Sequence, residues 1–229
     1  MEAIVLAGGL GTRLRSVVSD VPKPMAPVQG RPFLAFVLDR LVGAGFARAV
    51  LATGYRHESL GDFFGAEYRG MPLDYSVETE PLGTGGAIRL AWDRSGADQP
   101  FVLNGDTYLE LDFGAMLAAH TAAGAMLTLA VRHVPDAARY GALEIDGNRV
   151  RAFAEKGESG PAWINAGAYL LAPDLRSHFP AKGTFSFERD LLAPGVKAIR
   201  PLAFRCNGRF IDIGTPEDYR EAGRLLPTQ

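Results

Sequence analysis

The chain has 229 residues, 47% of them hydrophobic and 22% charged, which is typical of a globular protein with one good core or two small ones. Its net charge of −2 argues against nucleic acid or an anionic membrane as the main partner, because both select a basic surface. The single cysteine, Cys206, excludes an internal disulfide, and no apolar run approaches the roughly 18 residues that a membrane-spanning helix needs.

The first half of the chain alternates predicted strands with predicted helices. Met1 leads directly into the first strand without a signal-peptide pattern, so we expect a cytoplasmic protein. Pro32 opens a helix that ends at Gly43 and Gly45, and further helices are expected at 58–64 and about 84–93. Apolar runs predict buried strands at 3–7, 48–54, 73–78 and 100–106. Strands joined by helical crossovers predict a parallel, doubly wound sheet, which binds ligands beyond the carboxyl ends of its strands.

The second half of the chain has a mixed pattern. Asp112 caps a helix that runs to about residue 123, and Thr215 before Pro216 opens the last helix. The turn 146–148 interrupts an alternating run and predicts a β-hairpin, and apolar runs predict strands at 126–132 and 163–172. No repeat, low-complexity tract or linker is present, so we expect one α/β domain over 1–229 with a cleft between its halves.

A glycine-rich loop follows the first strand. Gly8, Gly9 and Gly11 precede Arg13, and Lys23 stands between two prolines. Backbone N–H groups in such a loop can bind phosphates, although glycines alone would equally suit a tight turn. The two cations favour phosphate binding, and the prolines restrict the backbone around Lys23, so less entropy is lost when it binds an anion.

Two aspartates follow β-like runs that lie far apart in the sequence. Asp106 ends the strand at 100–106, and Asp212 lies in "FIDIGT". If both side chains reach the cleft, they can hold Mg²⁺, which prefers one or two carboxylates together with phosphate oxygens and water. A turn-capping role is the alternative for Asp106.

The stretch "LAGGLGTRLRSVVSDVPKPMAPVQGRP" resembles the signature of the sugar-1-phosphate nucleotidyltransferases. The order of the later motifs is also similar, so that the resemblance covers nearly the whole chain: "EPLGTGGA", "LNGD", "YG", "EK", "NAG" and "IDIGTPEDY". Many relatives have P-L-T after T-R-L, where this chain has Ser16-Val17-Val18, a variant that resembles the heptose-1-phosphate guanylyltransferase branch.

The resemblance implies a Rossmann-like fold and the reaction NTP + sugar 1-phosphate → NDP-sugar + pyrophosphate, with Mg²⁺ held by Asp106 and Asp212. It implies that Arg13 binds the β- and γ-phosphates and that Lys23 contacts the phosphate at the reacting centre, as the two catalytic residues. Because the attacking phosphate oxygen is already anionic, no general base is needed, and positioning with cationic stabilisation accounts for the catalysis.

The resemblance also divides the domain into a nucleotide-binding half over about 1–106 and a sugar-binding half over about 107–229. The residues expected to bind the nucleotide are Leu6, Ala7, Gly8, Gly9, Gly11, Thr12, Arg13, Glu78, Glu80, Gly83 and Thr84. Those expected to bind the sugar are Gly105, Tyr140, Gly141, Glu155, Lys156 and Asn165. No role is assigned to Phe187, Glu188 or Arg209.

The second glycine cluster comprises Gly83, Gly85 and Gly86 and is expected to let a flat base or sugar ring lie against backbone. Close packing of a helix on the sheet would explain one of these glycines but hardly three. Glu78 stands where pyrimidine-using relatives have a glutamine, and its acceptor-only carboxylate suits the N1–H and N2–H₂ donors of guanine. Glu80 competes for the same role.

We therefore expect an enzyme that uses GTP and a manno-configured heptose 1-phosphate, for lipopolysaccharide or capsule assembly. Mannose-1-phosphate guanylyltransferase is the nearest alternative, followed by MurNAc-1-phosphate uridylyltransferase and a phosphocholine cytidylyltransferase. A non-catalytic nucleotide-sugar sensor is the alternative from another class, and the presence of Arg13, Lys23, Asp106 and Asp212 argues against it. No nucleic acid or membrane partner is expected, and the oligomeric state is open, with a homodimer as one option.

Overall fold

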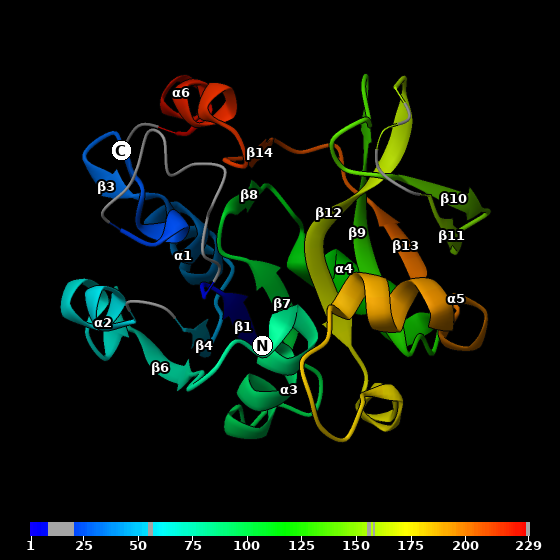
Figure 1. The fold of residues 1–229 in the computed structure, drawn as a ribbon, viewed down its shortest axis with the longest axis horizontal. Helices are drawn as coiled ribbons and strands as arrows, with labels where there is room; N and C mark the ends of the chain where they lie inside the picture. The colour runs from blue at the N-terminus through cyan, green and yellow to red at the C-terminus, as the bar shows by residue number, and fades with distance from the viewer. Residues whose placement is uncertain (9–20, 55–56, 155–156, 158, 228–229) are drawn as a thin grey trace.

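The computed structural model describes residues 1–8, 21–54, 57–154, 157 and 159–227. The described residues form a ten-stranded sheet with the order β10-β11-β13-β9-β12-β7-β1-β4-β6-β5, which crosses the whole molecule (Figure 1). Because this one sheet is built from both halves of the chain, nothing in it separates residues 1–106 from 107–229. The division of roles between those halves stays a prediction.

The first half contains the predicted parallel sheet. Strand β1 (Glu2–Leu6) lies between β4 (Arg48–Thr53) and β7 (Phe101–Asn104) and is parallel to both, and β4 is parallel to β6 (Met71–Val77). The predicted helices are α1 (Phe33–Gly43), α2 (Glu58–Phe64) and α3 (Gly83–Arg94). The carboxyl ends of β1, β4, β6 and β7 consequently share one edge of the sheet.

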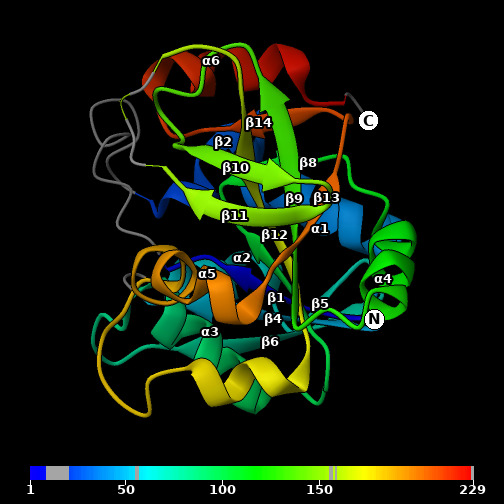
Figure 2. The ribbon, with the colours of Figure 1, turned by 90° about the vertical axis from the view of Figure 1, so that its right-hand side faces the viewer.

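Alternate residues of these strands contribute to cores on opposite faces, because successive side chains in a strand point in opposite directions. Val5 of β1 packs in a buried cluster with residues of α1 and of α4 (Phe113–Ala122), whereas Ile4 packs in a second cluster with residues of α3 and of α5 (Ala193–Ile199). Figure 2 shows α3 and α5 on one side of the sheet and α1 and α4 on the other. The sheet is therefore buried on both faces, as its continuous apolar runs predicted.

The second half extends the sheet with mixed strand directions. β12 (Ala162–Leu171) is antiparallel to both β7 and β9 (Leu127–Val134), β13 (Leu202–Arg205) is parallel to β9, and the predicted hairpin forms β10 (Ala142–Asp146) and β11 (Arg149–Phe153). The pairing of β12 with β9 is irregular between Asn165 and Tyr169. The last predicted helix is α6 (Pro216–Leu225), whose N-cap Thr215 accepts a hydrogen bond from the backbone N–H of Asp218 at 3.3 Å.

Several short elements were not predicted, because each depends on a partner that is distant in the sequence or on only a few residues. They are η1 (Lys23–Met25), β2 (Pro27–Val28), β3 (Arg31–Pro32), β5 (Glu67–Tyr68), β8 (Thr107–Leu109), η2 (Pro173–His178), the π-helical turn η3 (Phe187–Leu192), α5 and β13. The β-like run expected at Asp212 forms β14 (Phe210–Asp212). Within the described ranges, no helix is both long enough and apolar enough to cross a bilayer.

The N-cap of α4 provides a test of stability that is separate from the site. The Asp112 carboxylate accepts a hydrogen bond from the backbone N–H of Ala115 at 2.9 Å. We expect Asp112→Ala to lower the free energy of unfolding by about 0.5–2 kcal/mol, the usual effect of losing an N-cap side chain, measured by urea denaturation. Asp98→Ala, which removes an exposed carboxylate outside any helix, is the control, and equal stability of the two variants would contradict the capping role.

Candidate functional site

A cleft of about 340 Å³ lies beyond the carboxyl ends of β1 and β7. Both halves of the chain contribute to it, and the charged or polar side chains on its walls include Lys23, Asp106, Arg139, Tyr140, Asn165 and Asp212. Five of these six residues were predicted site residues, and Arg139 was not. The cleft lies where a parallel sheet is expected to bind its ligand.

Pairing of two short strands brings Asp106 and Asp212 to the same cleft. β14 is antiparallel to β8, with Asp212 opposite Thr107, the residue that follows Asp106. The backbone N–H of Ile213 also donates to the carbonyl of Asp106 at 3.2 Å. The predicted meeting of the two aspartates is therefore present in the fold.

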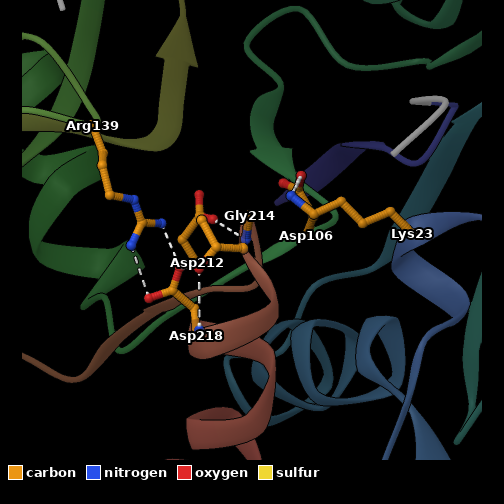
Figure 3. Close-up of polar contacts among 7 residues, drawn as sticks. Lys23, Asp106, Arg139, Asp212, Gly214 and Asp218 are labelled. Atoms are coloured by element: carbon orange, nitrogen blue, oxygen red, sulfur yellow. Dashed lines mark hydrogen bonds and ion pairs between the residues drawn. The ribbon is translucent and has the colours of Figure 1, made fainter. Parts of the chain in front are cut away.

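The charges of the two aspartates influence each other. The Lys23 ammonium forms an ion pair with Asp106, with 2.5 Å between Nζ and Oδ2, and only 12% of the lysine side chain is exposed (Figure 3). Asp212 accepts a hydrogen bond from the backbone N–H of Gly214 at 2.5 Å. Burial, together with the charge of Asp106, raises the pKa of Asp212, although Lys23 and Arg139 act in the opposite direction. Burial and the charge of Asp106 together thus outweigh Lys23, Arg139 and the Gly214 hydrogen bond in setting the direction of this shift.

Lys23 is the first residue of the short helix η1. Pro22 precedes it with an extended backbone, and Pro24 and Met25 are buried beneath it. The backbone N–H of Met25 donates to the carbonyl of Pro22 at 2.8 Å, which closes the turn. The ammonium is thus fixed beside Asp106 by a buried, proline-restricted backbone, as the sequence predicted for this lysine.

Arg139 is a residue of the cleft that the sequence analysis missed. Its guanidinium forms a bidentate ion pair with Asp218 of α6 (Figure 3). The Thr215 hydroxyl donates to the same carboxylate at 2.6 Å. This pair joins the segment before β10 to the helix that follows Asp212. Its only sequence signal was its position next to Tyr140 in the "YG" motif.

A second cavity, of about 230 Å³, adjoins the cleft and is mostly apolar. Leu6 and Thr84 line both cavities, and Gly8, Glu78 and Gly83 line the second one. Glu78 follows directly after β6, and its Oε2 accepts a hydrogen bond from the backbone N–H of Leu82 at 3.1 Å. Its half-buried position raises the pKa of Glu78, because desolvation disfavours the carboxylate.

Glu80 and Ala7 do not line either of these two cavities. Glu80 is exposed, so the structure separates it from the competing Glu78. Ala7 is buried, and its backbone N–H extends the pairing of β1 with β4 by donating to Ala52 at 2.8 Å.

The second glycine cluster packs closely against its neighbours. A Cβ on Gly85 would lie 2.1 Å from the ring of Phe185, and one on Gly86 would lie 2.7 Å from Cβ of Leu82. Gly83 has a φ of +70°, and its Cβ would lie 2.5 Å from the carbonyl oxygen of Phe185. Close packing therefore explains all three glycines, including Gly83, which also lines the second cavity. The contacts are with Phe185, which lies outside any strand, and with Leu82, the N-cap of α3, so they do not test the expectation about packing of the helix on the sheet.

Two further glycines expected at the sugar are not on the wall of the cleft. A Cβ on Gly105 would lie 2.7 Å from the carbonyl oxygen of Leu6, so this glycine lets the turn after β7 approach β1. Gly141 is buried with a φ of +83° and donates its N–H to Ala137 at 3.1 Å. The remaining predicted site residues lie outside the described residues: Gly9, Gly11, Thr12, Arg13, Glu155 and Lys156.

Comparison with known proteins gives the family. A sequence model of the family described as nucleotidyl transferase matches residues 2–229. The chain belongs to the nucleotidyl transferase family. The resemblance stated from the glycine-rich loop and the later motifs is thereby confirmed, and the chain is a nucleotidyltransferase by membership of that family.

Two curated relatives and one solved structure show how far the likeness extends. The D-glycero-alpha-D-manno-heptose 1-phosphate guanylyltransferase of Aneurinibacillus thermoaerophilus is 42% identical over 226 residues, which are 99% of this chain and 98% of that one. The mannose-1-phosphate guanylyltransferase of Mycobacterium tuberculosis is 36% identical over 226 residues, which are 96% of this chain but 62% of that protein. The crystal structure of HddC from Yersinia pseudotuberculosis matches 99% of both chains with a TM-score of 0.89 and 38% identity, and one crystal structure of HddC is complexed with GMP-PN.

The aspartate pair fits a magnesium ion. Within the described residues, no group of three or more His, Cys, Asp or Glu side chains is arranged to hold a metal, so a site that the protein completes alone is not found there. Two neighbouring carboxylates suit Mg²⁺, which takes its remaining ligands from phosphates and water. The raised pKa of Asp212 supports this fit, because a divalent cation would relieve the repulsion between Asp212 and Asp106.

The raised pKa of Asp212 leads to a prediction about stability and activity. A pKa that is higher in the folded than in the unfolded chain means that the free energy of unfolding falls as the pH rises through the folded value. Asp212→Asn keeps an oxygen for the Gly214 N–H and removes the charge, so it should raise the free energy of unfolding at pH 7. It should also lower turnover by at least roughly tenfold, since even residues that only support a metal site have effects of that size.

Urea denaturation across a pH series, together with steady-state kinetics, checks this prediction. The stability difference should disappear below about pH 4, where Asp212 is protonated in both states of the wild type. Asp98→Asn is the control for the removal of an exposed carboxylate. A less stable Asp212→Asn protein at pH 7 would contradict the electrostatic argument.

Proposed function

We propose that this chain transfers GMP from GTP to a D-glycero-α-D-manno-heptose 1-phosphate, giving GDP-heptose and pyrophosphate. The observation that carries the proposal is the adjacency of the two cavities, which share Leu6 and Thr84. One cavity offers a mostly apolar slot with an acceptor carboxylate, which suits a guanine base. The other holds Lys23, a donor for phosphate oxygens, and the aspartate pair, which would hold Mg²⁺. The full-length likeness to a heptose 1-phosphate guanylyltransferase supports the choice of sugar.

Lys23 is placed to act on the phosphates. An ammonium group has three donors, and Asp106 receives one of them in the structure. The remaining donors can bind oxygens of the α-phosphate, where negative charge accumulates as the sugar phosphate oxygen attacks and pyrophosphate leaves. Arg13 lies outside the described residues, and its role at the β- and γ-phosphates stays a prediction.

Asp106 and Asp212 would hold Mg²⁺, as the aspartate pair was expected to do. When bound there, the ion would neutralise charge on the phosphates and on the two carboxylates together. The residues of the chain then position the two substrates and neutralise the charge of their phosphates. No residue is required as a general base, because the nucleophile is already an anion.

A pyrophosphate-release assay with Mg²⁺ tests the proposal. GTP should be used in preference to UTP, CTP and ATP, and the heptose 1-phosphate should give a higher kcat/KM than mannose 1-phosphate. Faster turnover of mannose 1-phosphate would instead favour the mannose-1-phosphate alternative, which the likeness to the Mycobacterium tuberculosis protein supports. Nucleotide binding without turnover of any sugar 1-phosphate would favour a sensor and overturn the proposal.

Lys23→Ala should lower kcat by about 100- to 1000-fold, the effect of removing one preorganised donor to a transition state. The variant should still fold, because Pro24 and Met25 keep the buried contacts of η1. Lys197→Ala, which removes an exposed lysine of α5, is the control and should retain wild-type kcat. A Lys23→Ala enzyme with kcat within threefold of wild type would exclude Lys23 from the mechanism.

Glu78→Gln should reduce the preference for GTP over UTP by about tenfold, since a hydrogen bond to a charged group is replaced by a neutral one. The raised pKa of Glu78 adds a pH effect. As the pH falls through that pKa, the wild type should lose affinity for GTP, because a protonated carboxyl offers fewer acceptors, and the variant should not. Nucleotide titrations over a pH series measure both effects, and a loss in Glu80→Gln instead would assign base reading to Glu80.

A further inference from the structure

Three side chains form a hydrogen-bonded group on the wall of the cleft. Asn165 and Tyr169 belong to β12, and Glu188 belongs to η3. The Asn165 amide nitrogen donates to the Tyr169 hydroxyl oxygen and to Oε1 of Glu188, each at 2.7 Å, and the Tyr169 hydroxyl donates to the same Oε1 at 2.7 Å. Both donors therefore converge on one oxygen of a carboxylate.

An irregularity in β12 brings the first two side chains together. The four steps from Asn165 to Tyr169 face only the two steps from Val131 to Leu129 on β9. Gly167, at the centre of this bulge, has a φ of +73°, and a Cβ there would lie 2.5 Å from the side-chain amide of Asn104. The bulge thus requires glycine, and it aims Asn165 and Tyr169 at the same partner.

The hydrogen bonds fix the orientation of the Asn165 amide. The backbone N–H of Gly167 donates to Oδ1 at 3.1 Å, so the oxygen must be on that side. Both hydrogens of the amide nitrogen are then used by Tyr169 and Glu188, and one lone pair on Oδ1 remains. Asn165, which we expected to contact the sugar directly, has no donor left for it.

Glu188, in contrast to Asn165, keeps a free hydrogen-bonding atom for a ligand within the part of the chain that the structure describes. Among the described residues, no hydrogen bond reaches its Oε2, and its exposed side chain lines the cleft. Tyr169 is fully buried, and burial and the Glu188 charge raise its pKa well above the ordinary value, so its hydroxyl stays protonated and donates. The carboxylate is thus held by one oxygen and presents the other.

We propose that Glu188 is a sugar-binding residue whose Oε2 accepts hydroxyl hydrogens of the sugar, and that Asn165 and Tyr169 are positioning residues. The assignment rests on the proposed function. A carboxylate repels phosphate oxygens, so this wall faces the uncharged, hydroxyl-bearing part of the substrate, while Lys23 faces the phosphates. Sugar hydroxyls are the donors that a carboxylate held in this way recognises.

Glu188→Gln tests the assignment directly, because it replaces the hydrogen-bond acceptor that faces the cleft by a donor. Since Asn165 and Tyr169 both donate, the glutamine must turn its carbonyl oxygen toward them and its NH₂ toward the cleft. The KM for the sugar 1-phosphate should rise about tenfold or more, and the KM for GTP should stay within twofold of wild type. Tyr169→Phe keeps the ring packing on Phe187, at 5.2 Å between ring centroids, and should give a smaller rise in the same KM.

Mono-deoxy analogues of the sugar 1-phosphate add a readout that a purely structural role would not move. The wild type should discriminate against at least one analogue, and Glu188→Gln should not discriminate against that same analogue. Glu221→Gln, which changes an exposed glutamate of α6, is the matched control and should behave as wild type. Thermal unfolding of each variant verifies folding.

The outcomes separate this inference from the proposed function. A wild type that turns over a sugar 1-phosphate, with an unchanged KM and unchanged discrimination in Glu188→Gln, overturns the role of Glu188 alone. A wild type that turns over no sugar 1-phosphate overturns the proposed function and this assignment with it.

Discussion

The structure of the site depends on the close approach of two carboxylates, Asp106 and Asp212. Like charges repel most strongly where water is scarce, and the pKa of Asp212 is raised first by burial and then by the charge of Asp106. The two carboxylates stay close despite this repulsion, because β14 pairs with β8 and brings Asp212 next to Asp106. Lys23 compensates one of the charges through its ion pair with Asp106. The negative charge that remains on the pair is what a divalent cation would neutralise, and the same cation would attract the phosphates of the substrates.

The elements around this pair are organised to hold charge at fixed positions. A buried proline turn holds Lys23, and a bidentate ion pair to Asp218 holds Arg139 across from Asp212. A bulged strand and a buried tyrosine hold Glu188 on the wall of the cleft. Each charged group is thus restrained by neighbouring residues before a ligand binds, which lowers the entropy lost on binding. Preorganisation of this kind suits a reaction that needs positioning more than proton transfer.

The glycines near the second cavity have a role in packing that the sequence analysis did not assign to them. Gly83 lines the second cavity, as expected, yet Gly83, Gly85 and Gly86 are all required by contacts with Phe185 or Leu82. Phe185 lies about a hundred residues further along the chain, so no local pattern indicates it. Gly105 is likewise explained by the approach of its turn to β1. A glycine near a site is compatible with ligand contact and with close packing, and only the three-dimensional neighbours distinguish the two.

The sequence by itself determined the alternating elements, the parallel sheet of the first half, the caps at Asp112 and Thr215, and the residues at the strand ends. These follow from hydrophobic period and cap chemistry, which act over a few residues. The motifs also indicated the family and the pair Asp106 and Asp212. Only the tertiary structure decided that Glu78 rather than Glu80 lines the second cavity and that Arg139 enters the cleft. It also decided that Asn165 holds one carboxylate oxygen of Glu188, while the Glu188 side chain lines the cleft. The physical reason is that these outcomes depend on contacts between segments that are distant in the sequence, and on which hydrogen-bond donors and acceptors meet there. Neither can be inferred from the residues next to each side chain in the sequence.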